Sequence, residues 1–468
     1  MLIVLLAGCA VGPNYHPPKI KVDSAFENGA QTNLSTNETA IAWWQGFNDP
    51  ELTKLVEMAR AGNHDLRIAT ANLREARALR NSAVFDLLPV ANGNASYTDT
   101  QYSRAFVPTG GTSTSRHLEL YDAGFDATWE LDIFGRVRRS VEASSDEVQA
   151  AVANRRDILV SVISEVARNY FELLGAQGEL ITAEQNADNQ RQTLKITEDT
   201  RDGGRGTQLD VDRARAQLNN TLADIPPLQA EVARATHRLS VLTGQPPTAL
   251  TAELKDPRPF MEMPSLIAIS NPETLLRRRA DVRSAERSLA AATARIGVAT
   301  ADLFPRVTFN GNWSLEATKL SGLVKGGADT WSFGPSITWS ALDYGHVRAR
   351  MLAADARADA ALAMYQRTVL TTLEETENAL VNYSREQARR DFLRESEAAS
   401  RSAASLARQR YENGATDFLT VLDAERVLFQ AQDQLAQSNT RTATALVALY
   451  KSLGGGWEIE LKPGEKVK

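Results

Sequence analysis

Few side chains in this sequence could catalyse a reaction, and those few do not group. The five histidines show no metal-ligand spacing, because long stretches separate them. They are His16, His64, His117, His237 and His346. Gly203, Gly204 and Gly206 do not follow a strand pattern, so they indicate a turn and not a phosphate-binding loop. No nucleophile motif appears. The sequence therefore predicts no enzymatic activity, no metal site and no cofactor.

The single cysteine, Cys9, is a candidate for covalent modification. It directly follows the apolar run Leu2–Ala7, and Leu6-Ala7-Gly8-Cys9 is similar to the lipobox of bacterial lipoproteins, whose cysteine is lipidated. No lysine or arginine precedes the run, which departs from the usual pattern. The alternative is a buried, unmodified cysteine. A lone cysteine also excludes an internal disulfide.

Charged side chains gather in the stretch 410–426, which reads RYENGATDFLTVLDAER. Asn413-Gly414 is a turn signal, and helical spacing resumes directly after it. The stretch therefore predicts the tip of a helical hairpin. On spacing alone, Asp423 is a surface carboxylate that pairs with Arg426 three residues later, a contact worth a few tenths of a kcal/mol.

A near copy of this tip lies 210 positions earlier, at 200–216, where Arg213 stands in the place of Asp423. The same offset aligns Thr128-Trp129 with Thr338-Trp339. A repeat this long exceeds a solenoid unit, so it indicates a duplicated half-protein whose halves share one structure.

Composition narrows the function classes. The chain has 468 residues, 43% of them hydrophobic, and a formal net charge of −6. That is ample for a core, and without a basic block there is no reason to expect nucleic-acid binding. No apolar run reaches the length of a transmembrane helix.

Hydrophobic patterning divides the chain into six segments. We expect Trp43-Trp44 to dock the end of an extended arm. One helix then begins at Asp49-Pro50-Glu51 and continues to about Phe85. The segments are a signal remnant (1–9), the arm (10–48), the first half (49–245), a proline-rich linker (246–271), the second half (272–455) and a tail (456–468).

Each half contains two strand-like segments in which apolar and polar residues alternate over about ten residues, as in transmembrane β-strands. They lie at about 90–102, 118–129, 306–316 and 329–340. The alternative is a pair of soluble hairpins packed on a core. Four strands cannot close a membrane barrel, so chains that span a membrane this way must share one. Pro335 lacks an amide hydrogen, which predicts a bulge or an unpaired position. The candidate membrane-interface aromatics are Tyr97, Trp129, Trp313, Trp331 and Trp339.

After each strand pair the pattern becomes helical, with tips predicted at about 200–210 and 410–419. Apolar residues recur at steps of three and four, which predicts coiled-coil-like packing. In the first half they are Leu159, Ile163, Val166, Tyr170 and Leu173, and in the second Val369, Leu373, Thr376, Leu380 and Tyr383. The return helix of the first half meets Pro226-Pro227, which we expect to break it.

This order of elements, duplicated behind a lipobox, resembles the TolC-like outer-membrane efflux family, in particular its lipoprotein branch. The resemblance covers nearly the whole chain. The residues that carry it are Leu6–Cys9, Val11–Tyr15, Trp43-Trp44, Arg277–Val282, Phe304-Pro305 and, at the second tip, Arg410-Tyr411, Gly414, Leu419 and Val421–Ala424.

The resemblance implies a mainly helical fold with membrane β-strands. A homotrimer would combine four strands per protomer into a twelve-stranded outer-membrane barrel, continued by an α-helical barrel in the periplasm. The protein would be lipid-anchored. It would conduct small-molecule cargo passively from the periplasmic tunnel to the exterior, as the outer-membrane subunit of a tripartite efflux pump. Its expected partners are a periplasmic adaptor and an inner-membrane efflux transporter, which open the closed helix tips, and outer-membrane lipid.

The resemblance also assigns a periplasmic gate to the second tip. Leu419 and Asp423, one helical turn apart, would form rings around the channel axis, with Asp417 as a further candidate. Residues expected to hold the tip closed are Asp210, Asp212, Arg213, Arg410 and Tyr411.

Two other functions remain open at this point. One is the exit duct of a type I protein-secretion system. The other is a periplasmic coiled-coil scaffold lipoprotein, against which the four alternating strands argue, because a scaffold has no need of them. Nothing in the sequence identifies the cargo.

Overall fold

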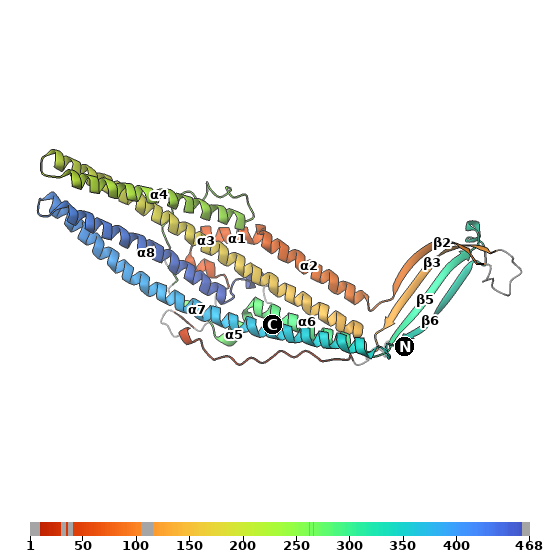
Figure 1. The fold of residues 1–468 in the computed structure, drawn as a ribbon. Coiled ribbons are helices and arrows are strands. Elements are labelled where there is room, and N and C mark those ends of the chain that lie inside the picture. The colour runs from red at the N-terminus through yellow and green to blue at the C-terminus, as the bar shows by residue number, and fades with distance from the viewer. Residues whose placement is uncertain are drawn as a thin grey trace. The chain divides into compact units, whose positions relative to one another are not determined.

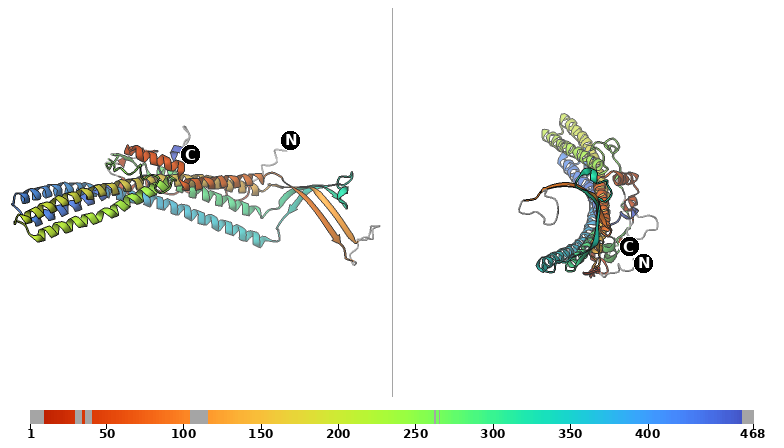
Figure 2. Two further views of the ribbon diagram at one scale, coloured as in Figure 1. Left: turned by 90° about the horizontal axis from the view of Figure 1, so that it is seen from above. Right: turned by 90° about the vertical axis from the view of Figure 1, so that its right-hand side faces the viewer.

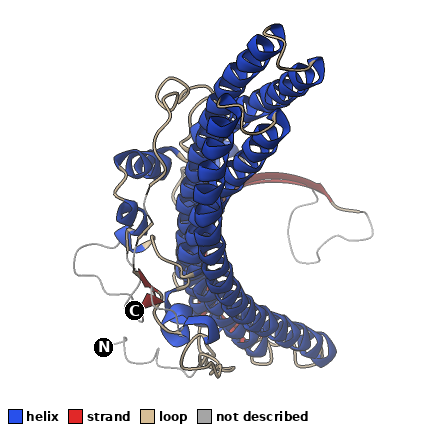
Figure 3. Cartoon of the chain, turned by 90° about the vertical axis from the view of Figure 1, so that its left-hand side faces the viewer, coloured by secondary structure: helices blue, strands red, loops and turns tan. Residues whose placement is uncertain are grey.

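The computed structural model describes residues 10–29, 34–35, 41–103, 116–261, 263–264 and 266–460. Cys9 and the apolar run before it lie outside these residues. The described chain is mainly helical (Figure 3). It also has one four-stranded antiparallel sheet and a short two-stranded one, which confirms the expected fold class. None of its described helices is both long enough and apolar enough to cross a membrane. The chain forms two compact units.

The first unit contains the four-stranded sheet. Its strands are β2 (Val90–Gln101), β3 (His117–Leu131), β5 (Arg306–Ala317) and β6 (Asp329–Thr338). They lie side by side in the order β2-β3-β5-β6 (Figure 1). Residues opposite each other in an antiparallel pair share a face. The register therefore collects most of the apolar residues on one face and most of the Asn, Ser and Thr residues on the other. The exceptions lie near the strand ends, where Val90, Leu118 and Leu120 stand on the polar face and Asp99, Glu119 and Asp329 on the apolar one.

Pro335 lies inside β6, and the expectation of a bulge there is wrong. The pairing of β5 with β6 continues without a slip from Arg306–Thr338 to Leu315–Asp329, and Pro335 stands opposite Phe309. Because β6 is an edge strand, a residue without an N–H fits this register when its nitrogen points away from β5, toward the open edge.

The start of the arm is fixed in the first unit. The N–H of Val11 donates to the carbonyl of Phe134 (3.1 Å), just after β3. Arg139 donates to the carbonyl of Val11 (3.1 Å) and to the side chain of Asn14 (2.8 Å). The Tyr15 hydroxyl donates to Glu286 (2.6 Å). The segment Val11–Tyr15 is thus held by hydrogen bonds although it has no secondary structure of its own.

The expectation of a single helix from about residue 49 to Phe85 is wrong. The structure has α1 (Pro50–Gly62) and α2 (His64–Phe85), separated by Asn63 in an extended conformation. The Asn63 carboxamide accepts hydrogen bonds from the N–H groups of Asp65 and Leu66 and donates to the carbonyl of Leu242 (2.9 Å). This capping satisfies the first N–H groups of α2, so the break costs little.

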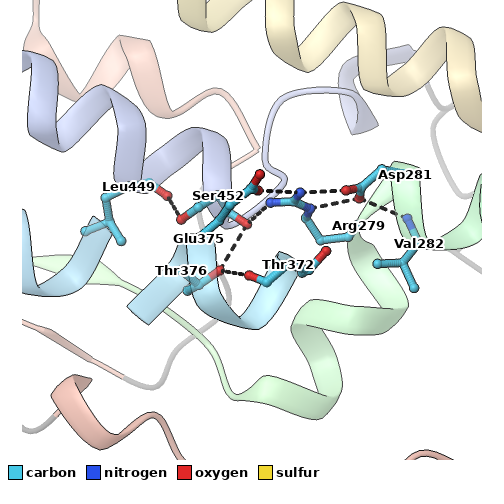
Figure 4. A network of polar contacts seen from close by, with 8 residues as sticks. All are labelled: Arg279, Asp281, Val282, Thr372, Glu375, Thr376, Leu449 and Ser452. Carbon is cyan, nitrogen blue, oxygen red and sulfur yellow. Dashed lines mark hydrogen bonds and ion pairs between the residues drawn. The ribbon is translucent and has the colours of Figure 1, made fainter. Parts of the chain in front are cut away.

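The second half has an equivalent break at Arg279, between α5 (Pro272–Arg278) and α6 (Ala280–Ala301). The Arg279 guanidinium donates to both carboxylate oxygens of Asp281 (2.8 and 2.6 Å), to Glu375 (2.9 Å) and to the carbonyl of Ser452 (2.8 Å) (Figure 4). Burial alone would raise the pKa of Asp281, but the hydrogen bonds and charge of Arg279 outweigh burial and lower that pKa. One buried cation therefore joins this break to two other helices of the second unit.

Two long hairpins follow the strand pairs. The first is α3 (Arg136–Asp202) with α4 (Gln208–Leu242), and the second is α7 (Tyr344–Glu412) with α8 (Phe418–Ser452). Figure 2 shows them side by side. The predicted seams are buried: all five positions of the first half, and four of the five in the second, Leu373 being half-buried.

The expectation that Pro226-Pro227 breaks the return helix is wrong, since α4 continues through both prolines. Two backbone N–H donors are lost there. Buried side chains on both sides, Val211 and Leu218 before the prolines and Leu239 after them, hold the two ends of α4 in the packing. Tertiary contacts therefore override the local preference.

The end of the arm closes the core of the second unit. The 3-10 turn η3 (Trp43–Phe47) buries Trp43, Trp44 and Phe47, and the Trp43 ring stacks on Tyr450 at 4.9 Å. Upstream, the 3-10 turn η2 (Glu27–Gly29) donates two backbone N–H groups to Glu377. The proline-rich linker contributes β4 (Ile267–Ala268), which pairs in parallel with β1 (Leu34–Ser35).

Candidate functional site

Both hairpin tips turn through the same backbone geometry. In the second tip the N–H of Gly414 bonds to the carbonyl of Tyr411 (2.9 Å) and the N–H of Ala415 to that of Arg410 (2.8 Å). Gly414 has a φ of 71°, which favours glycine because it lacks a Cβ. The first tip repeats both bonds around Gly204. This pair of hydrogen bonds ends each helix and lets the chain reverse its direction.

The helix after each tip begins with a side-chain cap made by one Asp and one Thr three residues apart. The Asp comes first at α8, and the Thr comes first at α4. At α8, the Asp417 carboxylate accepts from the N–H (3.0 Å) and hydroxyl (2.6 Å) of Thr420. At α4, Thr207 caps the helix and its hydroxyl donates to Asp210 (2.7 Å). The hydroxyl and N–H of Thr420 hold the pKa of Asp417 below its usual range. Asp417 and Asp210, two predicted site residues, are thus parts of helix caps.

Leu419 and Asp423 lie on an exposed face of α8. Together with Arg410 they line a groove of about 880 Å³ between α7 and α8. The Leu419 residue is 50% exposed although it is apolar. Asp423 accepts a hydrogen bond from Arg426 at 2.7 Å, so the ion pair expected from spacing is present. Within one chain, this face therefore presents an apolar side chain and a carboxylate one turn apart.

Asp417 lines the same groove as Asp423, whereas Asp210, Asp212, Arg213 and Tyr411 do not. Arg213 lies 3.9 Å from Asp210, and Asp212 accepts from Gln208 (2.9 Å). Among the described residues, these contacts stay within the first hairpin. The Tyr411 ring packs against Phe418 at 5.7 Å, where one hairpin closes on itself.

Sequence reasoning missed a buried cluster above the second tip. Arg408 on α7 donates to Glu425 on α8 (2.6 Å), and both contact the Thr193 hydroxyl on α3 (3.2 Å each). Glu425 is only 4% exposed. The signal was present, because Glu425 follows the buried Phe418 and Val421 at steps of three and four, where a charged residue is unusual.

A second cluster missed from the sequence is a groove of about 510 Å³ between α3, α4 and α8, lined by Glu179, Asp224 and Asp433. Burial, followed by the charges of Asp433 and Glu231, raises the pKa of Glu179 to about 7, although Arg441 opposes the shift. Burial and Asp224 likewise raise the pKa of Asp433, which Gln437 partly offsets. Glu179 and Asp433 therefore bind protons more tightly than free carboxylates do.

Replacing Glu179 with Gln is expected to stabilise the protein by about 1 kcal/mol at about pH 8, once partial exposure is taken into account. A carboxyl whose folded pKa is raised binds more protons in the folded state. Stability is therefore full below its unfolded pKa and falls as pH rises from about 4.5 to about 7. Denaturant unfolding at about pH 4.5 and pH 8 checks this.

The matched control for this prediction is Glu184→Gln, on the exposed side of the same helix. It is expected to leave the pH dependence unchanged. Equal pH profiles for wild type and Glu179→Gln would contradict the assignment.

Four of the predicted interface aromatics, Tyr97, Trp129, Trp313 and Trp331, share the apolar face of the sheet, and Trp339 directly follows the end of β6. Tyr97 stands opposite Tyr121 and Trp313 opposite Trp331. Trp129 lies eight residues from Tyr121 along β3, about 26 Å at about 3.3 Å per residue, close to the height of a membrane barrel's apolar band. The Trp129 and Trp339 indoles donate to the carbonyls of Leu87 (2.9 Å) and Leu303 (3.1 Å).

Comparisons with known proteins identify the family. Residues 55–245 and 271–455 match the family described as outer membrane efflux protein. The chain belongs to this family. It is 32% identical over 462 residues to nodulation protein T of Rhizobium leguminosarum bv. trifolii, covering 98% of this chain and 97% of that protein.

Two further matches agree. The solvent efflux pump outer membrane protein SrpC of Pseudomonas putida is 31% identical over 465 residues, covering 98% of this chain and 97% of that protein. The solved structure of the outer-membrane channel OprN is 44% identical with a TM-score of 0.88, covering 96% of this chain and all of that one. This outer membrane efflux protein is therefore an outer-membrane exit channel, which confirms the expected function, and its family is not an enzyme family.

Proposed function

We propose that this outer membrane efflux protein works as a homotrimer whose sheets close into one twelve-stranded barrel. The observation that carries the proposal is the pair of sheet edges. Within the described chain, β2 and β6 each have one neighbouring strand, although one face of the sheet is apolar. Unpaired edges are too costly in lipid, so further copies must supply the missing neighbours. Three copies give an even number of strands within the usual size range.

The partners we propose are a periplasmic adaptor and an inner-membrane efflux transporter. The supporting observation is that relatives such as SrpC are named as outer membrane proteins of efflux pumps. The named cargo of SrpC, solvent, makes small molecules the proposed cargo class. The aromatics Tyr97, Trp129, Trp313, Trp331 and Trp339 would contact the two lipid interfaces, because amphipathic rings favour that level.

We further propose that Leu419 and Asp423 form the periplasmic gate. In a trimer, three copies of the exposed Leu419 would exclude water, and three Asp423 carboxylates would attract cations while repelling one another. Arg410, which lines the same groove, and Tyr411 would hold the tip closed. For Asp417, Asp210, Asp212 and Arg213 the contacts support roles in capping and ordering the tips.

Lipidation of Cys9 also belongs to the proposal. The described chain starts at Ala10. The N–H of Val11 donates a hydrogen bond to the carbonyl of Phe134, which lies just after the end of β3. A lipid attached one residue before Ala10 would therefore leave the protein close to the end of the strands. Mass spectrometry of the N-terminal peptide tests this, since an unmodified cysteine would contradict it.

The test of the whole proposal is the oligomeric mass of the purified protein in detergent together with its conductance in a planar lipid bilayer. We expect a trimer with a small, cation-selective conductance. A monomer without conductance would mean that the strands do not span. A conductance with another stoichiometry would overturn the trimer alone.

A further inference from the structure

A cavity of about 360 Å³ lies in the first compact unit, where β3 and β5 meet the helices. Its volume falls within the range of small-molecule sites, roughly 300–1,000 Å³. The charged residues that line it are Glu130, Asp132, Arg136, Asp302, Arg306 and Arg350. They come from β3, α3, β5, α7 and the segment after α6. One chain therefore supplies the whole lining.

The strand residues of this cavity belong to the polar face of the sheet. Glu130 stands opposite Thr308 in the register of β3 with β5. Arg306 stands opposite Thr338 in the register of β5 with β6. Trp129, the neighbour of Glu130, points to the apolar face, because successive side chains of a strand alternate. In a barrel whose apolar face meets lipid, the cavity therefore faces the lumen, at the level where strands give way to helices.

Four of the charges around the cavity neutralise one another in close pairs. The Arg136 guanidinium donates to both carboxylate oxygens of Glu130, at 2.8 and 2.5 Å. Arg138 donates to the Asp132 carboxylate at 3.0 Å, and that carboxylate also accepts the N–H groups at the start of α3. Neither pair leaves a charge over for a ligand.

The remaining charges do not balance, because Arg306 and Arg350 share Asp302. Arg306 donates to Asp302 at 3.3 Å, and Arg350 lies 3.5 Å from the other oxygen of that carboxylate. The two arginine side chains are 48% and 58% exposed. Arg306 also approaches Glu130, but only to 3.8 Å. A guanidinium has more N–H donors than these contacts use, so the cavity offers an excess positive charge and free donors to an oxyanion.

The rest of the lining is apolar. Leu131, Ile133, Phe134, Phe304 and Pro305 line the same cavity. The rings of Phe134 and Phe304 stack on each other at 4.6 Å, and Phe304 is still 37% exposed. An anion that also carries an apolar group can therefore place that group against the exposed ring while its charge reaches the arginines.

The duplicated half lacks both arginines. The prolines that precede β2 and β5 align Val90 with Arg306. The offset of 210 that aligns the hairpin tips aligns Ser140 with Arg350. The same local fold therefore forms around uncharged residues, and the fold by itself does not require a pair of arginines at this place.

We propose that this cavity binds organic anions with an apolar body, such as aromatic carboxylic acids, during their passage through the channel. The carboxylate lies between Arg306 and Arg350, and the apolar body packs on Phe304. The passage rests on the trimeric channel proposed above, whereas the cavity is built within one chain. Conduction requires that a bound molecule can leave again, so we expect weak binding in fast exchange.

The experiment measures the binding of benzoate to the purified protein in detergent by ligand-detected NMR. We expect the combined variant Arg306→Gln, Arg350→Gln to bind benzoate at least several-fold more weakly than wild type. Arg348→Gln is the matched control, because Arg348 is an exposed arginine of the same helix that does not line the cavity. It should bind benzoate like wild type. Equal affinities of the wild type and the combined variant would overturn the site.

A variant with an expected gain of affinity guards against loss through misfolding. Asp302→Asn keeps the shape of the side chain but removes the carboxylate that competes with the ligand for both arginines. We expect it to bind benzoate several-fold more tightly than wild type, which an unfolded protein could not do. Unchanged or weaker binding by this variant would contradict the proposed position of the carboxylate.

Two competitors identify the chemical class of the ligand. Benzamide has the ring of benzoate without its charge, and inorganic phosphate has the charge without an apolar body. At equal concentration, neither should displace benzoate effectively. Displacement by benzamide would show that the arginines do not select the ligand. Displacement by phosphate would show that the site takes oxyanions in general, and either result would overturn the assignment to organic anions with an apolar body.

The same measurement keeps the cavity apart from the gate and from the trimer. Asp423 belongs to the second compact unit, so Asp423→Ala should leave benzoate binding unchanged. A monomer without conductance that still binds benzoate through its two arginines would overturn the channel and leave the binding site standing. A conducting trimer that binds benzoate no better than the combined arginine variant would overturn the binding site and leave the channel standing.

Discussion

Replacing Asp423 with alanine is expected to raise the conductance of the closed channel at least several-fold and to weaken its cation selectivity. The carboxylate is 62% exposed in one chain, and its only described ion pair is with Arg426, one turn away on the same helix. An exposed pair of this kind contributes little to stability. The variant should therefore fold normally, so that any change in conductance reports on the pore.

The physical reason lies in three-fold repetition. Three carboxylates close to one axis concentrate cations and exclude anions, and truncation to alanine removes the charge and widens the opening. Leu419→Ala should also increase leak, but with selectivity preserved, because the charges remain. Single-channel recording at two salt concentrations separates the two effects, since the electrostatic part is screened by salt.

Asp199→Ala is the matched control, because Asp199 is an exposed carboxylate near the end of the first hairpin's α3. It is expected to conduct like wild type. If Asp423→Ala conducts no more than this control, the assignment of the gate to Asp423 is wrong and Asp423 is a surface residue paired with Arg426.

Replacing Arg279 with alanine is expected to lower the free energy of unfolding by about 3–5 kcal/mol, the largest stability effect that we predict. Its side chain is 10% exposed and makes hydrogen bonds to Asp281, Glu375 and the carbonyl of Ser452. Removing the cation leaves Asp281 partly buried without its partner, and burial then raises the pKa of that carboxyl. Denaturant unfolding of the detergent-solubilised protein measures the loss.

Two variants show whether the position or the charge is responsible. Arg277→Ala removes an exposed arginine two residues earlier, whose one ion pair among the described residues is with Glu273, and is expected to change stability by less than about 0.5 kcal/mol. Arg279→Lys keeps the charge but cannot bond both oxygens of Asp281 together with Glu375, so an intermediate loss is expected. Equal stability of Arg279→Ala and Arg277→Ala would show that the network in Figure 4 contributes little.

Periodic features could be predicted from the sequence because a local pattern suffices to determine them. The alternation in Tyr97, Trp313 and their neighbours predicts strands with one apolar face, since successive side chains of a strand point to opposite faces. The steps of three and four from Leu159 to Leu173 predict a buried helical seam. Asn413-Gly414 predicts a turn, because a helix that reverses needs a residue at positive φ.

Features that depend on distant partners could not be predicted this way. Asn63 interrupts a helical pattern because its side chain reaches the carbonyl of Leu242, 179 positions away. Pro226-Pro227 stay inside α4 because packing on both sides holds that helix. The helix preference of a single residue is worth at most about 3 kcal/mol. Tertiary contacts contribute free energies of similar magnitude, so they can override that preference.

The candidate sites divide in the same way. Sequence alone determined that the chain consists of two related halves, each with a strand pair and a hairpin tip, because duplication and periodicity are properties of residue order. Only the tertiary structure decided that Thr193 meets Arg408 and Glu425, and that Glu179 faces Asp433. These residues come from different helices, and Thr193 lies 215 positions before Arg408 and 232 before Glu425, so packing brings the side chains together and sets their protonation and burial.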